Sequence, residues 1–327
     1  MRVGLFNDTS VSGHIGCTAV MATLLDEVRL RGAAPAWLWP VATPWQAHAH
    51  WLDRQGVDAI MVNGEGTLHH SAERQRTRDL LALPRYAQGR GVPIHLVNAS
   101  VSAMDAAGIE ALRTFTTIHV REGESQNYLA SHGIASEVVA DLSLGASLPT
   151  PNGLRRGIFV TDCVLRETAE ALRRFANVAG ARHERMQRPR FGRPLATVRR
   201  MLDRLRPAPG RCVWRPRSNP HDFMRRLQGA ELVVTGRFHT VLLCLLSNTP
   251  VLALSSNTRK IEAVMLDCLG HQKRMIRPEA LEGSDAAARL LALAPYSAAE
   301  SEALACYREH ARQGRNRMFD SLLCRGN

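Results

Sequence analysis

The stretch that decides the fold runs from Glu231 to Ser255 and reads ELVVTGRFHTVLLCLLSNTPVLALS. It predicts an apolar β-strand, a turn with Gly236, Arg237 and His239, an apolar helix and a second apolar strand. A helix that joins two consecutive strands is typical of a crossover connection, so we expect the strands to be parallel. The turn is unusual, because cationic groups flanked by core residues need a compensating anion.

The same alternation of strand and helix occurs on both sides of this stretch. A Pro/Gly-rich break at residues 148–154, LPTPNGL, separates one series from the next. The alternation predicts an α/β protein in two halves, residues 1–150 and 151–327, each with a parallel sheet between helices. The expected strands are RVGLFN, DAIMVNG, PIHLVNAS, TIHVRE, EVVAD, GIFVTDC, RCVW, ELVVTG, PVLALS and KRMI, and the expected helices span about 17–31, 73–89, 103–114, 125–132 and 167–179.

Composition and charge restrict the class of protein. The chain has 327 residues, 45% of them hydrophobic, which is enough for two domains with buried cores. Its formal net charge of +12 comes almost wholly from arginine, because Lys260 and Lys273 are the only lysines, and it favours an anionic partner. The seven cysteines form no C-x-x-C pair, which argues against disulfides and zinc. We expect a cytoplasmic protein, because no signal-peptide pattern opens the chain and no apolar run is long enough to span a bilayer.

An arginine-rich segment, residues 181–226, interrupts the second half. One interpretation is a solvated helix and loop. The other is an electrostatic surface for a phosphorylated acceptor or for an anionic membrane, which would make the protein peripheral to the inner membrane. Nucleic acid is not an expected partner, because the segment has few aromatic side chains to stack on bases and no recognisable binding module.

Loops that follow strands are the candidate sites, since ligands of open parallel sheets collect beyond the carboxyl ends of the strands. The loop after the first strand, NDTSVSGHIGC, contains Gly13 and Gly16, which let the backbone approach a ligand. His14 lies between them, next to a helix N-terminus that can bind an anion. An ordinary glycine-containing turn with a polar histidine is the alternative.

The loop VNGEGTLHH, residues 62–70, places Glu65 between Gly64 and Gly66 directly behind an apolar strand. A charged side chain there must face a ligand site or find a partner, so Glu65 is a candidate general acid or base. A turn carboxylate that caps the next helix is the alternative. The two adjacent histidines of this loop point in different directions and have no third ligand, so we expect no metal site.

Two further loops carry arginine. Arg121 ends the strand of TIHVRE, where its side chain would reach the ligand edge of the sheet or, alternatively, a carboxylate such as Asp141. Arg237 and His239 stand two residues apart, so in an extended turn they would project to the same side. With the N-terminus of the next helix they would form an anion-binding focus, unless a buried carboxylate satisfies them.

The order of these motifs resembles the polysaccharide pyruvyl transferase family. The stretches that carry the resemblance are GHIGC, VNGEGTLHH, VREGES with VVADLSL, and VVTGRFHTVLLCLLSNTPVLALSSNTRKIEAVMLDCLG. They lie within residues 1 to about 270, and the most specific are GRFHT with NTPVLAL and the following lysine, and VRE with Asp141. The chain departs from the family pattern at NGEG, where a run of glycines is commoner, and in the arginine-rich segment.

The resemblance implies two Rossmann-like domains that face each other across a cleft, as in the GT-B glycosyltransferases. We expect the first domain on the acceptor side, the second on the donor side, and the C-terminal helix packed back on the first domain. Members of the family use phosphoenolpyruvate as a co-substrate, without a further cofactor. They place a pyruvate ketal on a sugar of a cell-surface polysaccharide or of its lipid-linked precursor.

The resemblance also implies roles for single residues. Arg237 and His239 fit the R-x-H segment that binds the donor's phosphate and carboxylate, Arg121 fits the upstream arginine, and Lys260 the later lysine. His239 would in addition act as an acid, and Glu65 would deprotonate the acceptor hydroxyl. Two other interpretations stay open: a GT-B-like glycosyltransferase with a nucleotide-sugar donor, and an inactive glycan- or anion-binding module.

Overall fold

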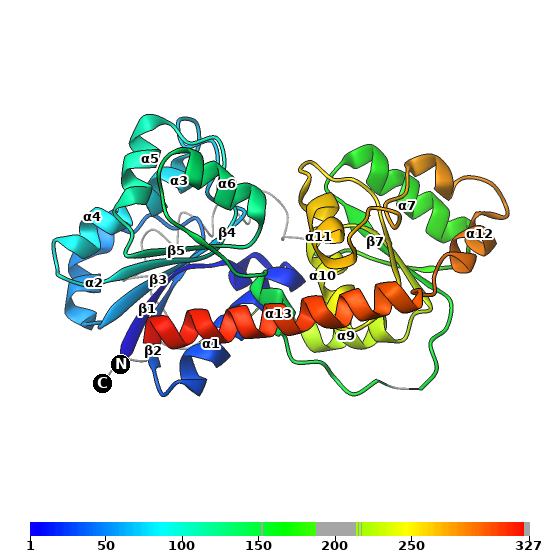
Figure 1. Ribbon diagram of the computed structural model, residues 1–327, viewed down its shortest axis with the longest axis horizontal. Helices are drawn as coiled ribbons and strands as arrows, with labels where there is room; N and C mark the ends of the chain where they lie inside the picture. Colours follow the sequence, from blue (N-terminus) through cyan, green and yellow to red (C-terminus); the bar gives the residue numbers. More distant parts are fainter. Residues whose placement is uncertain (152, 188–213, 215, 217, 324–327) are drawn as a thin grey trace, which may run out of the picture.

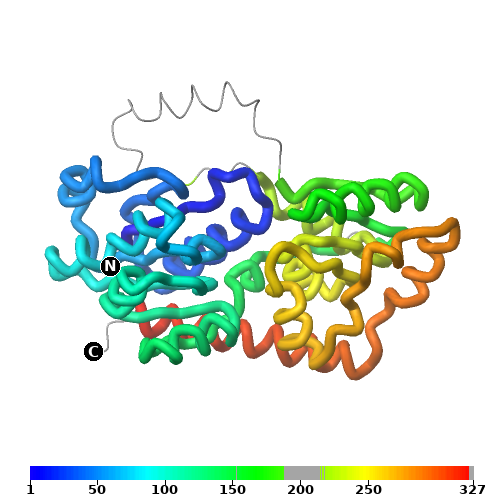
Figure 2. Tube along the Cα trace, turned by 90° about the horizontal axis from the view of Figure 1, so that it is seen from above, coloured from blue at the N-terminus to red at the C-terminus, as the bar shows by residue number. Residues whose placement is uncertain are grey.

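The computed structural model describes residues 1–151, 153–187, 214, 216 and 218–323. Two parallel β-sheets with flanking helices form two halves, and the long helix α13 (Ala298–Leu323) runs along both (Figure 1). Figure 2 shows the halves in line, with α13 along one side of both. The predicted α/β class with two Rossmann-like halves is confirmed.

The first sheet has six parallel strands in the order β2-β1-β3-β4-β5-β6. Its strand β2 was not predicted from the sequence, because prolines at residues 35 and 40 argue against a strand. The structure places β2 at the edge of the sheet, where the missing N–H groups of proline are tolerated. The strands are β1 (Arg2–Asp8), β2 (Ala34–Pro40), β3 (Ala59–Glu65), β4 (Ile94–Ala99), β5 (Thr117–Val120) and β6 (Glu137–Val138).

Helices connect these strands, as expected of parallel pairs. The single helix predicted over 73–89 is wrong, because the structure divides it at Ala82 into α3 and α4. Pro84 explains the break, since proline has no N–H to donate to the carbonyl of Leu80. The elements are η1 (Thr9–Ser12), α1 (Ile15–Leu30), η2 (Gln46–His48), α2 (Ala49–Gln55), α3 (Gln75–Leu81), α4 (Leu83–Gln88), α5 (Ala106–Arg113), α6 (Gly123–Ser131) and η3 (Leu142–Gly145).

The second sheet has four parallel strands in the order β10-β9-β7-β8. The strand predicted at KRMI is wrong, because Met275 makes only an isolated bridge to Ala253. The prediction at RCVW lies almost wholly outside the described residues, as does most of the arginine-rich segment. The elements are β7 (Ile158–Cys163), α7 (Arg166–Val178), β8 (Arg182–Glu184), α9 (Pro220–Gln228), β9 (Leu232–Gly236), α10 (Phe238–Leu246), β10 (Val251–Ala253), α11 (Lys260–Leu269), η4 (Pro278–Leu281) and α12 (Ala286–Ala292).

The two halves share core residues. Ile15 and Ala19 of α1 belong to the apolar cluster beneath the second sheet, whereas Met318 and Phe319 of α13 belong to a cluster beneath the first. Burial of these side chains stabilises the junction by roughly 1.5–3 kcal/mol for each large one. No helix in the described part of the chain is long and apolar enough to cross a membrane.

Candidate active site

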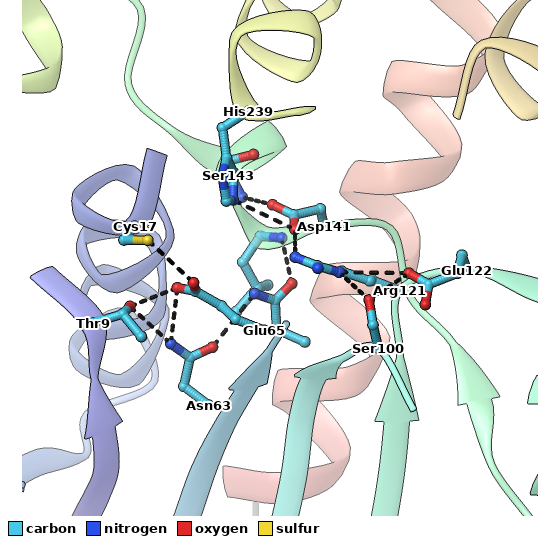
Figure 3. A network of polar contacts seen from close by, with 12 residues as sticks. Thr9, Cys17, Asn63, Glu65, Ser100, Arg121, Glu122, Asp141, Ser143 and His239 are labelled. Atoms are coloured by element: carbon cyan, nitrogen blue, oxygen red, sulfur yellow. Dashed lines mark hydrogen bonds and ion pairs between the residues drawn. The ribbon is translucent and has the colours of Figure 1, made fainter. Parts of the chain in front are cut away.

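Side chains that follow the carboxyl ends of β1, β3, β5 and β9 meet at the junction of the two halves (Figure 3). The first loop contacts the second half directly: the N–H of Ile15 donates to the carbonyl of Met186 at 3.1 Å. The hydroxyls of Thr18 and Ser218 are 2.6 Å apart and buried. These contacts bring the strand-end residues of both sheets into one polar network.

Arg121 is the buried centre of this network. Its Nη1 donates to Asp141 Oδ2 at 2.7 Å, its Nε donates to Ser100 Oγ at 2.7 Å, and Glu122 Oε2 lies 3.4 Å from Nε (Figure 3). Burial by itself would raise the pKa of Asp141, but Arg121, His239 and the hydrogen bonds of Ser143 together outweigh it and hold that pKa below its usual value. The salt bridge that the sequence left as an alternative is therefore present.

The Nη2 atom of Arg121 faces away from these carboxylates, toward Gly66. A Cβ added to Gly66 would lie 3.8 Å from Arg121 Nη2 and 3.5 Å from Lys260 Nζ, so both cations face this glycine. Lys260 is the first residue of α11, and its side chain makes no hydrogen bond or salt bridge with the residues that the structure describes. Burial, followed by the charge of Arg121, lowers the pKa of Lys260 to about 8. The Gly66 turn is thus lined by hydrogen-bond donors from both halves.

His239 lies across the junction from the first loop. Its Nε2 is buried, 3.9 Å from Asp141 Oδ2, and has no hydrogen-bond partner among the described residues. Burial lowers the pKa of His239 although Asp141 and Glu65 favour the charged form, so the imidazole is neutral at pH 7. A buried polar atom without a partner is uncommon in a folded protein, so this nitrogen is a candidate ligand contact.

The first loop packs against His239. The rings of His14 and His239 are 5.4 Å apart, and burial, followed by the charges of His239 and Arg237, lowers the pKa of His14 to about 3. A Cβ at Gly16 would lie 2.2 Å from His239 Cγ, so only glycine fits there. Gly13 adopts φ 75° and ends the short helix η1, without contact to the network.

Arg237 is paired, and not with the first half. Its Nε donates to Asp162 Oδ1 at 3.0 Å and its Nη2 donates to Asp162 Oδ2 at 2.5 Å, which leaves Nη1 without a partner among the described residues. The extended turn expected over Arg237 and His239 is wrong, because helix α10 already begins at Phe238. The ring of Phe238 instead stacks on Arg121, with 4.9 Å from guanidinium carbon to ring centroid.

Glu65 has a left-handed backbone with φ 40° and a buried side chain. Its carboxylate accepts hydrogen bonds from Thr9 Oγ1 at 2.5 Å, Cys17 Sγ at 3.2 Å and Asn63 Nδ2 at 3.2 Å (Figure 3). Burial, and then the charge of Glu65, raise the pKa of Cys17 well above its usual value, so its thiol keeps the proton. Gly64 has no room for a side chain, since a Cβ would lie 2.5 Å from that of Ala99.

Sequence reasoning missed several of these side chains. Asp162 ends a strand in GIFVTDC, so the rule that found Arg121 could also have found it. Phe238 and Cys17 gave no signal, because a residue within an apolar helix is more often core. No group of three or more histidine, cysteine and carboxylate side chains arranged to hold a metal occurs in the described ranges.

Comparisons with known proteins agree with this architecture. Among solved structures, a candidate UDP-N-acetylglucosamine 2-epimerase from Listeria monocytogenes matches with a TM-score of 0.62 at 13% identity, over 98% of this chain and 95% of that chain. The UDP-GlcNAc 2-epimerase of Methanocaldococcus jannaschii has a TM-score of 0.55 at 12% identity, over 98% and 100%. MurG from Acinetobacter baumannii has a TM-score of 0.54 at 12% identity, over 98% of both chains. At these identities they show the fold alone, and the predicted GT-B-like arrangement is confirmed.

The sequence comparisons are more specific. No curated protein matches the chain. The sequence model of one family, described as polysaccharide pyruvyl transferase, matches residues 27–258, which include Glu65, Arg121, Arg237 and His239. Because this match covers more than half of the chain, the chain belongs to the polysaccharide pyruvyl transferase family.

Proposed function

We propose that this chain transfers the pyruvyl group of phosphoenolpyruvate to two hydroxyls of one sugar, as a ketal, in a polysaccharide or its lipid-linked precursor. The observation that carries the proposal is the buried, unpartnered Nε2 of His239, held between Asp141 and the first loop. A transferase that acts on an anionic donor needs a polar group that is kept dry until the substrate arrives.

The arginines of the site support binding of the donor's phosphate and carboxylate. Asp162 and Asp141 each fix the plane of one guanidinium, while Nη1 of Arg237 and Nη2 of Arg121 stay available. Such preorganised donors need no rearrangement when charge develops, and the fork of arginine matches carboxylate and phosphate. Lys260 adds a third cation at the Gly66 turn.

The proton transfers follow from the charges. A bound phosphate dianion would raise the pKa of His239 and so make it the acid that protonates the terminal methylene of phosphoenolpyruvate. The first sugar hydroxyl then attacks C2 and gives its proton to Glu65. The second hydroxyl attacks C2 as phosphate leaves with the electrons of the C–O bond, and the now neutral His239 takes up its proton. Glu65 then gives its proton to the leaving phosphate, so that one proton ends in the methyl group, one leaves with phosphate, and both residues return to their starting states.

Release of phosphate from phosphoenolpyruvate, with a panel of glycan acceptors, tests the proposal. We expect His239→Ala to lower the rate by about 100-fold or more, since general acid–base catalysis contributes that much. The matched control is His221→Ala, an exposed histidine of the same half, which should keep the wild-type rate. Near wild-type release by the His239 variant would remove the assignment.

Thermal-shift titration separates this function from the nucleotide-sugar alternative. A donor that binds the folded state alone stabilises it by an amount that grows with the ratio of its concentration to its Kd, so phosphoenolpyruvate should raise the Tm of the wild type. Stabilisation by uridine diphosphate, without any by phosphoenolpyruvate, would favour a glycosyltransferase instead. Absence of both shifts and of phosphate release would favour a binding module.

A further inference from the structure

A second group of basic side chains lies beside the proposed donor site, on the loop between β3 and α3. Arg74 Nη1 lies within hydrogen-bond distance of His69 Nε2, and His69 Nδ1 is 2.8 Å from His70 Nδ1. Because arginine can only donate, His69 Nε2 must accept, and its proton is on Nδ1, directed at His70. His69 is therefore a neutral link, and the positive charge belongs to Arg74.

Lys260 approaches the same loop from the other half of the molecule. Burial, then the charges of Arg74, His70 and Lys260, lower the pKa of His69 to about 4, so both cations act on this ring. The Nζ of Lys260 also faces Gly66 in the same loop. The loop from Gly66 to Arg74 thus carries a cation of the first half, Arg74, and faces a cation of the second half, Lys260.

These two cations differ from the arginines of the donor site. Arg121 and Arg237 hold carboxylates at 2.7 and 2.5 Å, whereas no carboxylate of the described residues lies within 4.0 Å of the charged atoms of Arg74 or Lys260. Only one of the five N–H groups of Arg74 has a partner in the described part of the chain. Burial lowers the pKa of both cations. Partly buried charges that no carboxylate contacts favour the binding of an anion.

We propose that Arg74, which His69 orients, and Lys260 form a subsite for a phosphate or diphosphate group carried by the acceptor. Two cations from opposite halves match the charge of a diphosphate better than that of a single carboxylate. Lys260 of this subsite and Arg121 of the donor site both face Gly66, so an acceptor held here by its phosphate lies next to the donor. That the ligand is an acceptor rests on the proposed function, whereas anion binding at Arg74 does not.

Calorimetric titration with inorganic pyrophosphate, in the presence of saturating phosphoenolpyruvate, tests the subsite. We expect Arg74→Gln to raise the Kd for pyrophosphate about tenfold or more, as the loss of a charge-assisted hydrogen bond predicts. Arg74→Lys should restore part of the affinity. The matched control is Arg85→Gln, which removes the same charge from an exposed position of α4 and should leave the Kd unchanged.

The outcomes separate this subsite from the proposed function. Unchanged pyrophosphate binding by Arg74→Gln would overturn the subsite even if phosphoenolpyruvate still binds. Equal losses in Arg74→Gln and Arg85→Gln would also overturn it, since they would indicate a diffuse charge effect. If Arg74→Gln alone loses pyrophosphate binding and the protein does not bind phosphoenolpyruvate, the subsite is retained and phosphoenolpyruvate is excluded as the donor. Vesicles with a lipid-linked diphosphate, compared with phosphatidylglycerol vesicles, distinguish a lipid-borne group from free diphosphate.

Discussion

Carboxylates, more than the cations themselves, define the site at the scale of single residues. Asp141 and Asp162 hold Arg121 and Arg237, so neither arginine carries a free charge before the donor binds. Their pairing limits non-specific attraction of anions and fixes the direction of the remaining N–H groups. Specificity for the donor would then come from the position of these groups and of His239 more than from net charge.

Gly16→Ala tests how closely the position of His239 is set. An added methyl would lie 2.2 Å from His239 Cγ, so the imidazole must move. We expect phosphate release to fall about 100-fold, because displacement of a catalytic group by about 1 Å has that effect. Overpacking should also cost about 1–3 kcal/mol of stability.

Gly123→Ala is the matched control for this substitution. A Cβ at Gly123, the first residue of α6, would have no neighbour within 4 Å. Its activity should equal that of the wild type. Full activity of Gly16→Ala, with the loss confined to stability, would show that His239 does not need its present position.

The elements of secondary structure show how far the sequence carries. Strand-end loops could be located from chain order alone, so Glu65, Arg121 and Arg237 were found as candidates. Their hydrogen-bond partners could not be located in this way. Arg237 pairs with a carboxylate 75 residues away, and the local sequence pattern does not determine the order of the strands in the sheet. At β2 the sequence pattern led to the opposite error, because its prolines argue against a strand. They are tolerated because β2 lies at the edge of the sheet.

The contact between α1 and α13 depends on a buried ion cluster. Glu27 of α1 accepts hydrogen bonds from Arg31 at 2.5 Å and from Arg315 of α13 at 2.6 Å. Glu27→Gln would leave Arg315 without its anion, whereas Arg31 keeps Asp320, so we expect a loss of about 3 kcal/mol in the free energy of unfolding. Urea denaturation followed by circular dichroism measures it.

Glu309→Gln on α13 is the control for this cluster. Glu309 also pairs with an arginine, Arg312, but both side chains are about half exposed. Exposed pairs are screened by water and salt, so the substitution should leave the denaturation midpoint nearly unchanged. Equal effects of the two substitutions would mean that the buried cluster does not hold the helices together.

At the scale of the whole molecule, the halves meet through uncharged as well as charged groups. The described contacts between them include the neutral ring pair of His14 and His239 and the buried hydroxyls of Thr18 and Ser218. Protonation of either histidine would place a positive charge in this buried part of the junction. Acid should therefore weaken the molecule at the junction.

His14 makes this a measurable dependence on pH. Burial, with His239 and Arg237 nearby, lowers its folded-state pKa to about 3 from an ordinary 6.5, so the unfolded chain binds more protons between these values. The stability that His14 contributes is complete above about pH 6.5 and is lost as pH falls toward 3. Between pH 7 and pH 5, protonation of His14 in the unfolded chain should lower the free energy of unfolding of the wild type by roughly 1–2 kcal/mol. His14→Gln should not show this part of the loss. His50→Gln, which changes a histidine at an exposed position, should lose as much as the wild type. An equal shift of the urea midpoint between pH 7 and pH 5 in all three proteins would contradict the role of His14.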